Sequence, residues 1–292
     1  MKLSGDELRY QMVICFLVGV LLLISIFPLI YVICVSLTSE SEWLIRGNLM
    51  LIPYAPSIEA YKRIFFTNAL ILNSFYISVS RTVIGTMLTM TFSLLIGYAV
   101  SRRDMPGHKF ILLIVLITVL FSGGLIPTFL VIKATGLYNS FWSMIIPGLV
   151  NSWSVLVFRQ FFVGLPREIE EAAEIDGIGK LGLLIRIVIP MSTAVIAALG
   201  LFAAVGHWNA WFDALVYINN NKLKPLQLIL YIMHSDANIG YNVNELTNFE
   251  ERVSTRSLRM ALTVVGTVPI LCVYPFLQKY FTKGVYVGSV KG

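Results

Sequence analysis

The chain has 292 residues, of which 57% are hydrophobic and 13% are charged, and its formal net charge is +6. In an ordinary soluble domain about 25% of the residues are charged, so the composition of this chain excludes a soluble globular domain. The apolar residues fall into blocks of about 20 or more, the length that crosses a bilayer core. Each block must be helical, because lipid offers no partner to exposed backbone groups. The basic residues are scattered through short loops, which argues against nucleic-acid binding.

Six membrane-spanning segments are predicted from the limits of the apolar blocks. They are residues 12–36, 73–100, 110–132, 141–162, 191–218 and 258–281. The first is too long for a signal-peptide core of about 7–15 residues, so we expect a retained anchor. The cysteines (Cys15, Cys34 and Cys272) all lie inside these segments without metal-ligand spacing, and we expect no metal site.

The distribution of Lys and Arg predicts the orientation in the membrane. An even number of spans places both termini on one side, together with the turn at 101–109 and the loop at 163–190. These short stretches hold more Lys and Arg than the other loops do, and Ser101-Arg102-Arg103 is the clearest instance. Because such an excess marks the cytoplasmic side, both termini and the 163–190 loop are predicted to be cytoplasmic.

The polar loop at 163–190 is predicted to form a helix, a turn and a second helix. Pro166 suits a first helical turn, and the acidic residues that follow it are favoured near the positive end of the helix dipole. Ile169, Ala172 and Ala173 share a face, whose small side chains would let a groove on another protein approach closely. Gly177 can take the left-handed conformation that ends a helix. An interfacial helix lying on lipid is the alternative, but this helix is acidic where anionic lipid favours basic residues.

The spacing within this loop resembles the coupling motif of permease subunits in bacterial binding-protein-dependent ABC importers. The matching residues are Glu171, Ala172, Ala173, Asp176, Gly177, Ile187 and Pro190. Further segments resemble the carbohydrate branch of this family, in its MalG-like and LplC-type subunits. These segments are Ser122 to Thr128, Trp208 to Phe212, Pro225 to Gln227 and the tail from Lys283 to Gly292.

The resemblance implies an all-α fold of six transmembrane helices, the type I ABC importer permease fold with a cytoplasmic coupling helix. It divides the chain into residues 1–72 (an N-terminal transmembrane helix and a periplasmic loop), 73–282 (the importer core) and 283–292 (a cytoplasmic tail). It also implies a multi-pass protein of the bacterial cytoplasmic (inner) membrane that pairs with a second permease subunit. Two ATP-binding subunits, which use ATP and Mg, and a periplasmic or lipid-anchored sugar-binding protein complete the expected importer.

The chain is predicted to have no enzymatic activity alone and to bind no cofactor. The nearest approach to a phosphate-binding loop is Gly177-Ile178-Gly179-Lys180, but the leading glycine position is Glu174 and Leu181 replaces the Ser or Thr. A permease for another small solute is one alternative. An ion-coupled secondary transporter is another, but it needs an acid at the membrane midplane, and Asp213 near an outer end is the only acid in any predicted span.

Polar and aromatic residues inside the spans are candidates for contact with substrate, because polar groups there usually face a water-filled cavity. The candidates are Asn151, Trp153, Trp208, Asn209, Trp211 and Asp213. Tryptophans at the membrane interface and asparagines between helices also serve as anchors, so both interpretations stay open. Arg81 is expected to extend toward the membrane surface, although an anionic sugar would make it a ligand. The cargo is expected to be an oligosaccharide, and acidic ones are candidates.

The loop at 219–257 is long for a simple connection, which favours a docking role. We expect it to contact the sugar-binding protein. The polar residues that suggest this are Asn219 to Lys224, Asn242, Asn244, Glu250, Glu251, Arg252 and Arg256.

Overall fold

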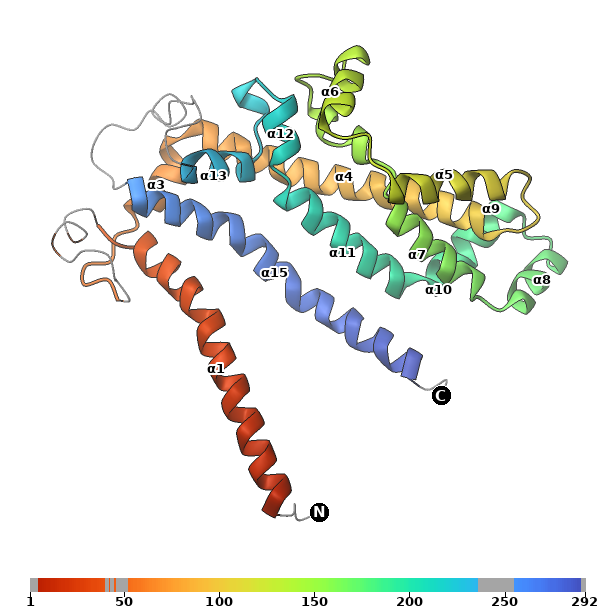
Figure 1. The fold of residues 1–292 in the computed structure, drawn as a ribbon, viewed down its shortest axis with the longest axis horizontal. Coiled ribbons are helices and arrows are strands. Elements are labelled where there is room, and N and C mark those ends of the chain that lie inside the picture. The colour runs from red at the N-terminus through yellow and green to blue at the C-terminus, as the bar shows by residue number, and fades with distance from the viewer. Residues whose placement is uncertain (1–4, 40–41, 43–44, 46–51, 236–254, 290–292) are drawn as a thin grey trace. The chain divides into compact units, whose positions relative to one another are not determined.

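A computed structural model describes the chain except for residues 1–4, 40–41, 43–44, 46–51, 236–254 and 290–292. In the described ranges every regular element is helical, as the composition predicts (Figure 1). The chain separates into two compact units. One comprises Met1–Leu72 and Ile232–Val268, and the other comprises Asn73–Tyr231 and Pro269–Gly292.

The first unit is dominated by helix α1 (Gly5–Ser36), whose apolar side chains are exposed along most of its length. Short helical turns follow in α3 (Glu59–Lys62) and the π-helix η1 (Arg63–Thr67). The first turn of helix α15 (Thr255–Ser289) is tied to the end of α1, because the Ser257 hydroxyl donates a hydrogen bond to the Thr38 carbonyl at 2.7 Å. Exposed apolar side chains over the length of α1 are what a lipid-facing helix requires.

The second unit is built around α4 (Ala69–Ser101), α7 (Ser152–Val163) and α11 (Thr193–Asn209), with α5 (His108–Leu120) packed on α7 (Figure 1). One buried cluster joins all three main helices through Leu94, Phe158 and Leu199. Gly97 lets α4 and α7 approach closely, since a Cβ atom at this position would lie 2.6 Å from the Phe158 Cβ atom.

Three of the predicted spans are broken rather than continuous. Residues 110–132 divide into α5 and α6 (Leu125–Ala134), and Gly124 between them has a φ of +82°, a conformation that favours glycine. Short 3₁₀ turns, η2 (Phe141–Met144) and η3 (Ile146–Gly148), precede α7 at a bend of 44°. In the fifth predicted span, α11 ends at Asn209 and a short helix, α12 (Phe212–Tyr217), follows. Apolar composition alone does not reveal these breaks.

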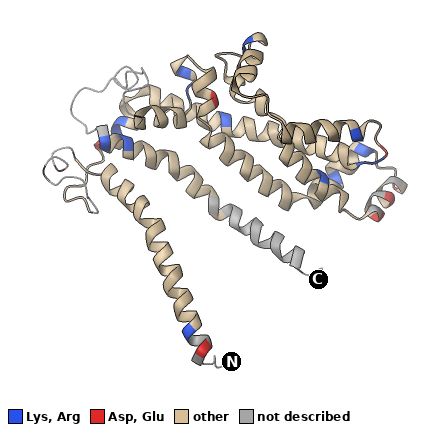
Figure 2. Cartoon of the chain, in the orientation of Figure 1, with Lys and Arg blue, Asp and Glu red and all other residues tan. Residues whose placement is uncertain are grey.

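Among the described residues, three helices are long and apolar enough to cross a membrane, and up to five spans result if each bent pair counts as one. The three are Arg9–Ser36, Ala69–Ser101 and Arg256–Val273. Most charged side chains lie at helix ends and in connections, with long uncharged stretches between them (Figure 2). The count of six spans stays a prediction.

Candidate functional site

The loop at 163–190 folds as helix α8 (Arg167–Ile175), a turn, and a second helical stretch. Helix α8 begins directly after Pro166, and Gly177 after its end has a φ of +75°, as the sequence predicts. The backbone N–H groups of Asp176 and Ile178 donate to the carbonyls of Ala172 and Ala173 at 3.1 and 2.9 Å, which closes the helix end. The second stretch runs through α9 (Lys180–Leu183), the π-helix η4 (Leu184–Val188) and α10 (Ile189–Met191).

The two alanines of this loop do not share an exposed face, contrary to our expectation. Ala173 is only 3% exposed and belongs to the same buried cluster as Phe162 and Leu183, within this chain. Ala172 is exposed, and the side chain of Ile175 is 87% exposed at the end of α8. Ile175 was not among the residues predicted from the sequence, although an isoleucine near the end of an otherwise acidic helix was a usable signal. One alanine therefore anchors α8, and the outward face is formed by its neighbours.

The other residues of the coupling motif fall into the same two groups. Ile187 packs against the buried cluster, whereas Pro190 is exposed in the first turn of α10. Glu171, Asp176 and Gly177 are exposed. Among the motif residues, Ala173 and Ile187 thus hold the loop to the helices, whereas Glu171, Ala172, Asp176, Gly177 and Pro190 are exposed.

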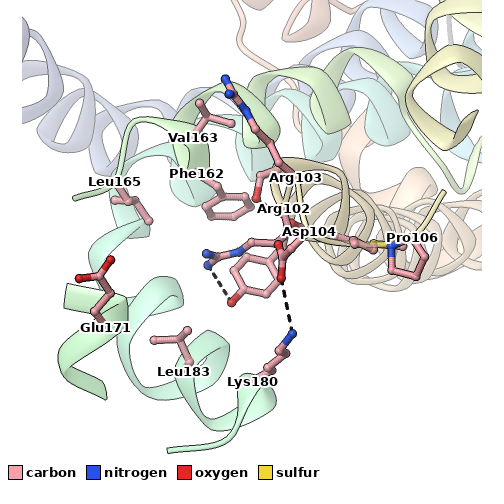
Figure 3. Close-up of a pocket in the computed structure, with 14 residues that line it drawn as sticks. Arg102, Arg103, Asp104, Pro106, Phe162, Val163, Leu165, Glu171, Lys180 and Leu183 are labelled. Atoms are coloured by element: carbon pink, nitrogen blue, oxygen red, sulfur yellow. Dashed lines mark hydrogen bonds and ion pairs between the residues drawn. The ribbon is translucent and has the colours of Figure 1, made fainter. Parts of the chain in front are cut away.

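A cavity of about 750 Å³ lies between α8, α9 and the turn that follows α4 (Figure 3). The Arg102 guanidinium lies over the Tyr98 ring at 4.5 Å, and Arg102 Nη2 donates to the Tyr98 hydroxyl at 2.9 Å. Lys180 Nζ lies 3.7 Å from Asp104 Oδ2, but both side chains are largely exposed. An exposed pair of this kind contributes ~0–1 kcal/mol, so the buried cluster rather than the ion pair holds the loop at 163–190 in place.

A second cavity, of about 450 Å³, contains four of the predicted substrate residues: Arg81, Asn151, Trp153 and Asp213. Sequence reasoning missed other residues of its wall. These are Thr89, Ser143, Met144, Pro147, Gly148, Phe202, Ala203, Gly206, His207, Ala210 and Tyr217. Phe202, Ala203 and Gly206 are three or four residues apart on α11, so one face of this helix lines the cavity, and that spacing was a signal available in the sequence.

Arg81 does not extend to the membrane surface as expected but is buried inside the second unit. Its side chain is 2% exposed and forms an ion pair with Asp213, whose side chain is 29% exposed. The Arg81 guanidinium also donates to the carbonyls of Ala210 at 2.9 Å and Met144 at 3.2 Å. A buried charge is stable only when it is paired and hydrogen-bonded, and this arrangement provides partners for both terminal nitrogens of Arg81.

The remaining aromatic candidates lie outside this cavity. Trp208 is buried and meets the Phe75 ring edge-on, with ring centroids 6.1 Å apart. Trp211 stacks on Tyr231 with ring centroids 3.8 Å apart. Asn209 is exposed and is absent from the cavity wall. Trp208 and Trp211 therefore pack against other rings of this chain, whereas Trp153 is 52% exposed in the cavity wall.

No family model matches the chain. Over 271 residues it is 40% identical to the polygalacturonan/rhamnogalacturonan transport system permease protein YtcP of Bacillus subtilis (strain 168), with 92% of this chain and 94% of YtcP covered. The chain belongs to the permease family of sugar ABC transport systems. The permease is also 39% identical over 273 residues to the protein LplC of the same organism, with 92% and 90% covered.

A solved structure supports the same assignment. A crystal structure of a bacterial ABC transporter involved in the import of the acidic polysaccharide alginate contains a chain with a TM-score of 0.86 and 27% sequence identity. The match covers 96% of the permease and 99% of that chain. The permease is therefore a multi-pass membrane protein and a transport subunit for carbohydrate, and the comparisons do not favour an ion-coupled secondary transporter.

Proposed function

We propose that the permease forms half of the translocation pathway of an ATP-driven carbohydrate importer in the bacterial cytoplasmic membrane. A second, related permease subunit forms the other half, two ATP-binding subunits use ATP and Mg, and a periplasmic or lipid-anchored protein delivers the sugar. The observation that carries this proposal is the arrangement of α8, with Ala173 buried in its own subunit and Ala172 and Ile175 exposed.

Helix α8 can transmit a movement because its inner side is packed into the helices. Ala173 shares a buried cluster with Phe158 and Phe162 of α7, Leu94 of α4 and Leu199 of α11. A packed core transmits displacement instead of absorbing it. An ATP-binding subunit that binds the exposed side of α8 and displaces it would therefore move α4, α7 and α11 together.

In this proposal the coupling loop and both termini are cytoplasmic, and the chain crosses the membrane six times. The division into residues 1–72, 73–282 and 283–292 follows the same topology. The loop at 219–257 would face the sugar-binding protein. Asn242, Asn244, Glu250, Glu251 and Arg252 of that loop lie outside the described residues, whereas Asn219 is held by its N–H donating to Asn139 Oδ1 at 2.9 Å.

The cargo we propose is an acidic oligosaccharide. YtcP is named for polygalacturonan and rhamnogalacturonan, and the solved importer is described as one for the acidic polysaccharide alginate. The cavity that contains Asn151, Trp153 and Asp213 supplies a ring and hydrogen-bonding groups, which is the combination that saccharides use.

The experiment that tests this function is reconstitution of the permease with its partner subunits in lipid nanodiscs. We expect ATP hydrolysis to rise when a sugar-binding protein loaded with galacturonate trimer is added. A permease that purifies without any ATP-binding subunit would overturn the proposed assembly. Stimulation by neutral oligosaccharides but not by the galacturonate trimer would overturn only the proposed cargo.

A further inference from the structure

We propose that the Arg81–Asp213 pair creates a saccharide subsite in the 450 Å³ cavity, in which Asp213 accepts hydrogen bonds from sugar hydroxyls. Arg81 is the positioning residue: it holds Asp213 in place without touching the sugar. This inference rests on the proposed function, since it assumes that saccharide enters this cavity. The alternative is a site in which the arginine itself binds a sugar carboxylate. In the subsite proposed here the aspartate contacts the sugar instead.

The exposure of the two side chains decides which of them a ligand meets. Asp213 is 29% exposed and lines the cavity, whereas only 2% of the Arg81 side chain is exposed. The terminal nitrogens of Arg81 already donate to the carbonyls of Ala210 and Met144 and to the Asp213 carboxylate. A sugar carboxylate would reach the guanidinium only by displacing Asp213.

Asp213 retains acceptor capacity after its contacts within the chain are counted. Its Oδ1 accepts from the backbone N–H of Ala214 at 2.8 Å, and its Oδ2 accepts from Arg81. An ionised carboxylate offers about four lone-pair sites, so roughly two remain for donors in the cavity. Sugar hydroxyls are donors that fit this requirement, and hydrogen bonds to an ionised acceptor are stronger than neutral ones.

The start of α7 supplies the complementary groups. Trp153 meets Phe202 edge-on at a centroid distance of 6.0 Å and still exposes half of its surface, so its ring can receive the C–H face of a sugar. Asn151 Oδ1 accepts from the backbone N–H of Ser154 at 2.8 Å, which leaves the amide nitrogen of Asn151 as the donor. The cavity thus combines an anionic acceptor, an amide donor and a ring.

Electrostatics argue against the reverse assignment. If a sugar carboxylate displaced Asp213, two carboxylates would lie close to one guanidinium, and like charges at such distances repel strongly. We therefore infer that this subsite binds a hydroxyl-bearing part of the saccharide. The carboxylates of an acidic oligosaccharide would be accommodated elsewhere in the importer.

The test uses the complete importer in proteoliposomes with galacturonate trimer as the probe, and it measures uptake per ATP hydrolysed. Asp213→Asn removes the ionic acceptor, and we expect it to lower uptake per ATP by about tenfold, the effect of losing one hydrogen bond to a charged group. ATP hydrolysis stimulated by the loaded binding protein should persist. Asp6→Asn, an exposed acid on α1, serves as the matched control and should leave uptake per ATP unchanged.

Asp213→Asn leaves the buried Arg81 without its ion-pair partner, which can prevent folding. The double variant Arg81→Gln with Asp213→Asn avoids this problem. It has no buried charge at this pair, and it should show the same loss of uptake per ATP. If Arg81 instead binds the sugar carboxylate, Asp213→Asn will raise uptake per ATP, which would overturn the assignment. If importers that assemble with either variant keep the normal uptake per ATP, the pair has only a structural role and the proposed subsite is wrong. A wild-type importer that the trimer does not stimulate would contradict the proposed cargo, and this result is distinct from the effect of the two variants on uptake per ATP.

Discussion

Ala172 and Ala173 are neighbours in the sequence, but only Ala173 of helix α8 is buried. Ala173 packs beside Phe162 and Leu183 in the buried cluster, and Ala172 is exposed. The pair therefore separates two roles of the coupling loop: attachment to the membrane helices and contact with another subunit.

Enlarging each alanine should have a different effect. Ala173→Leu places extra methylenes in a filled core, which costs about 1–3 kcal/mol, so we expect a lower thermal unfolding temperature of the purified permease. Ala172→Leu should leave that temperature unchanged and reduce the amount of ATP-binding subunit that co-purifies. Equal loss of thermal stability in both variants would contradict the two-sided arrangement of α8.

Ile175 is predicted to be an apolar contact for the ATP-binding subunit. Ile175→Glu should reduce co-purification of that subunit without lowering the unfolding temperature, because the side chain is exposed and has little native packing to lose. Ile45 is also exposed, in a loop predicted to lie on the other side of the membrane, so Ile45→Glu is the matched control. The docking role of Ile175 is wrong if both variants retain the ATP-binding subunit equally.

Gly177 is required for its backbone conformation and not for lack of space. Its φ is +75°, and a Cβ atom there would meet nothing within 4 Å. A β-branched residue in this conformation costs about 1–2 kcal/mol, so Gly177→Val should reorient α8 and lower the stimulation of ATP hydrolysis by the loaded binding protein. Gly177→Asn should retain most of it, since asparagine tolerates the left-handed region. If valine is tolerated as well as asparagine, then the turn does not set the coupling geometry.

Unlike Gly177, Gly97 is needed for lack of space, because α4 and α7 approach each other closely at this position. Gly97→Ala should lower the thermal unfolding temperature of the permease, because the new Cβ atom would lie 2.6 Å from that of Phe158 and the helices would have to separate. At Gly19 in α1 an added Cβ atom would meet nothing within 4 Å, so Gly19→Ala is the control and should be neutral or slightly stabilising. Equal unfolding temperatures for the two variants would argue against tight α4–α7 packing.

Trp153 is predicted to be a surface for the sugar ring. Trp153→Ala should lower uptake of galacturonate trimer per ATP, since stacking and apolar contact with a ring are lost. Trp142 is similarly exposed but does not line the cavity, so Trp142→Ala should leave uptake per ATP unchanged. A comparable loss in both variants would show that the effect is not specific to the cavity.

The sequence predicted the all-helical membrane fold and the α8 turn well, because hydropathy, an acidic first turn and Gly177 are local signals. It could not show that Ala173 faces inward, since the spacing of small residues does not reveal which of them meets the core. The Arg81–Asp213 pair joins positions 132 residues apart, and no local pattern connects them. Trp208 and Trp211 were candidates for contact with substrate because they are aromatic residues inside a predicted span. Their contacts with Phe75 and Tyr231 depend on tertiary packing, which the sequence does not reveal.

The central claim is that a separate ATP-binding subunit drives this permease through α8. The most direct measurement compares the complete importer carrying wild-type permease with the one carrying Ile175→Glu, recording both the bound ATP-binding subunit and galacturonate uptake. The account predicts that the wild-type importer retains the ATP-binding subunit and takes up the trimer only with ATP, and that the variant loses both. Uptake by the wild-type permease that proceeds without any ATP-binding subunit would contradict it.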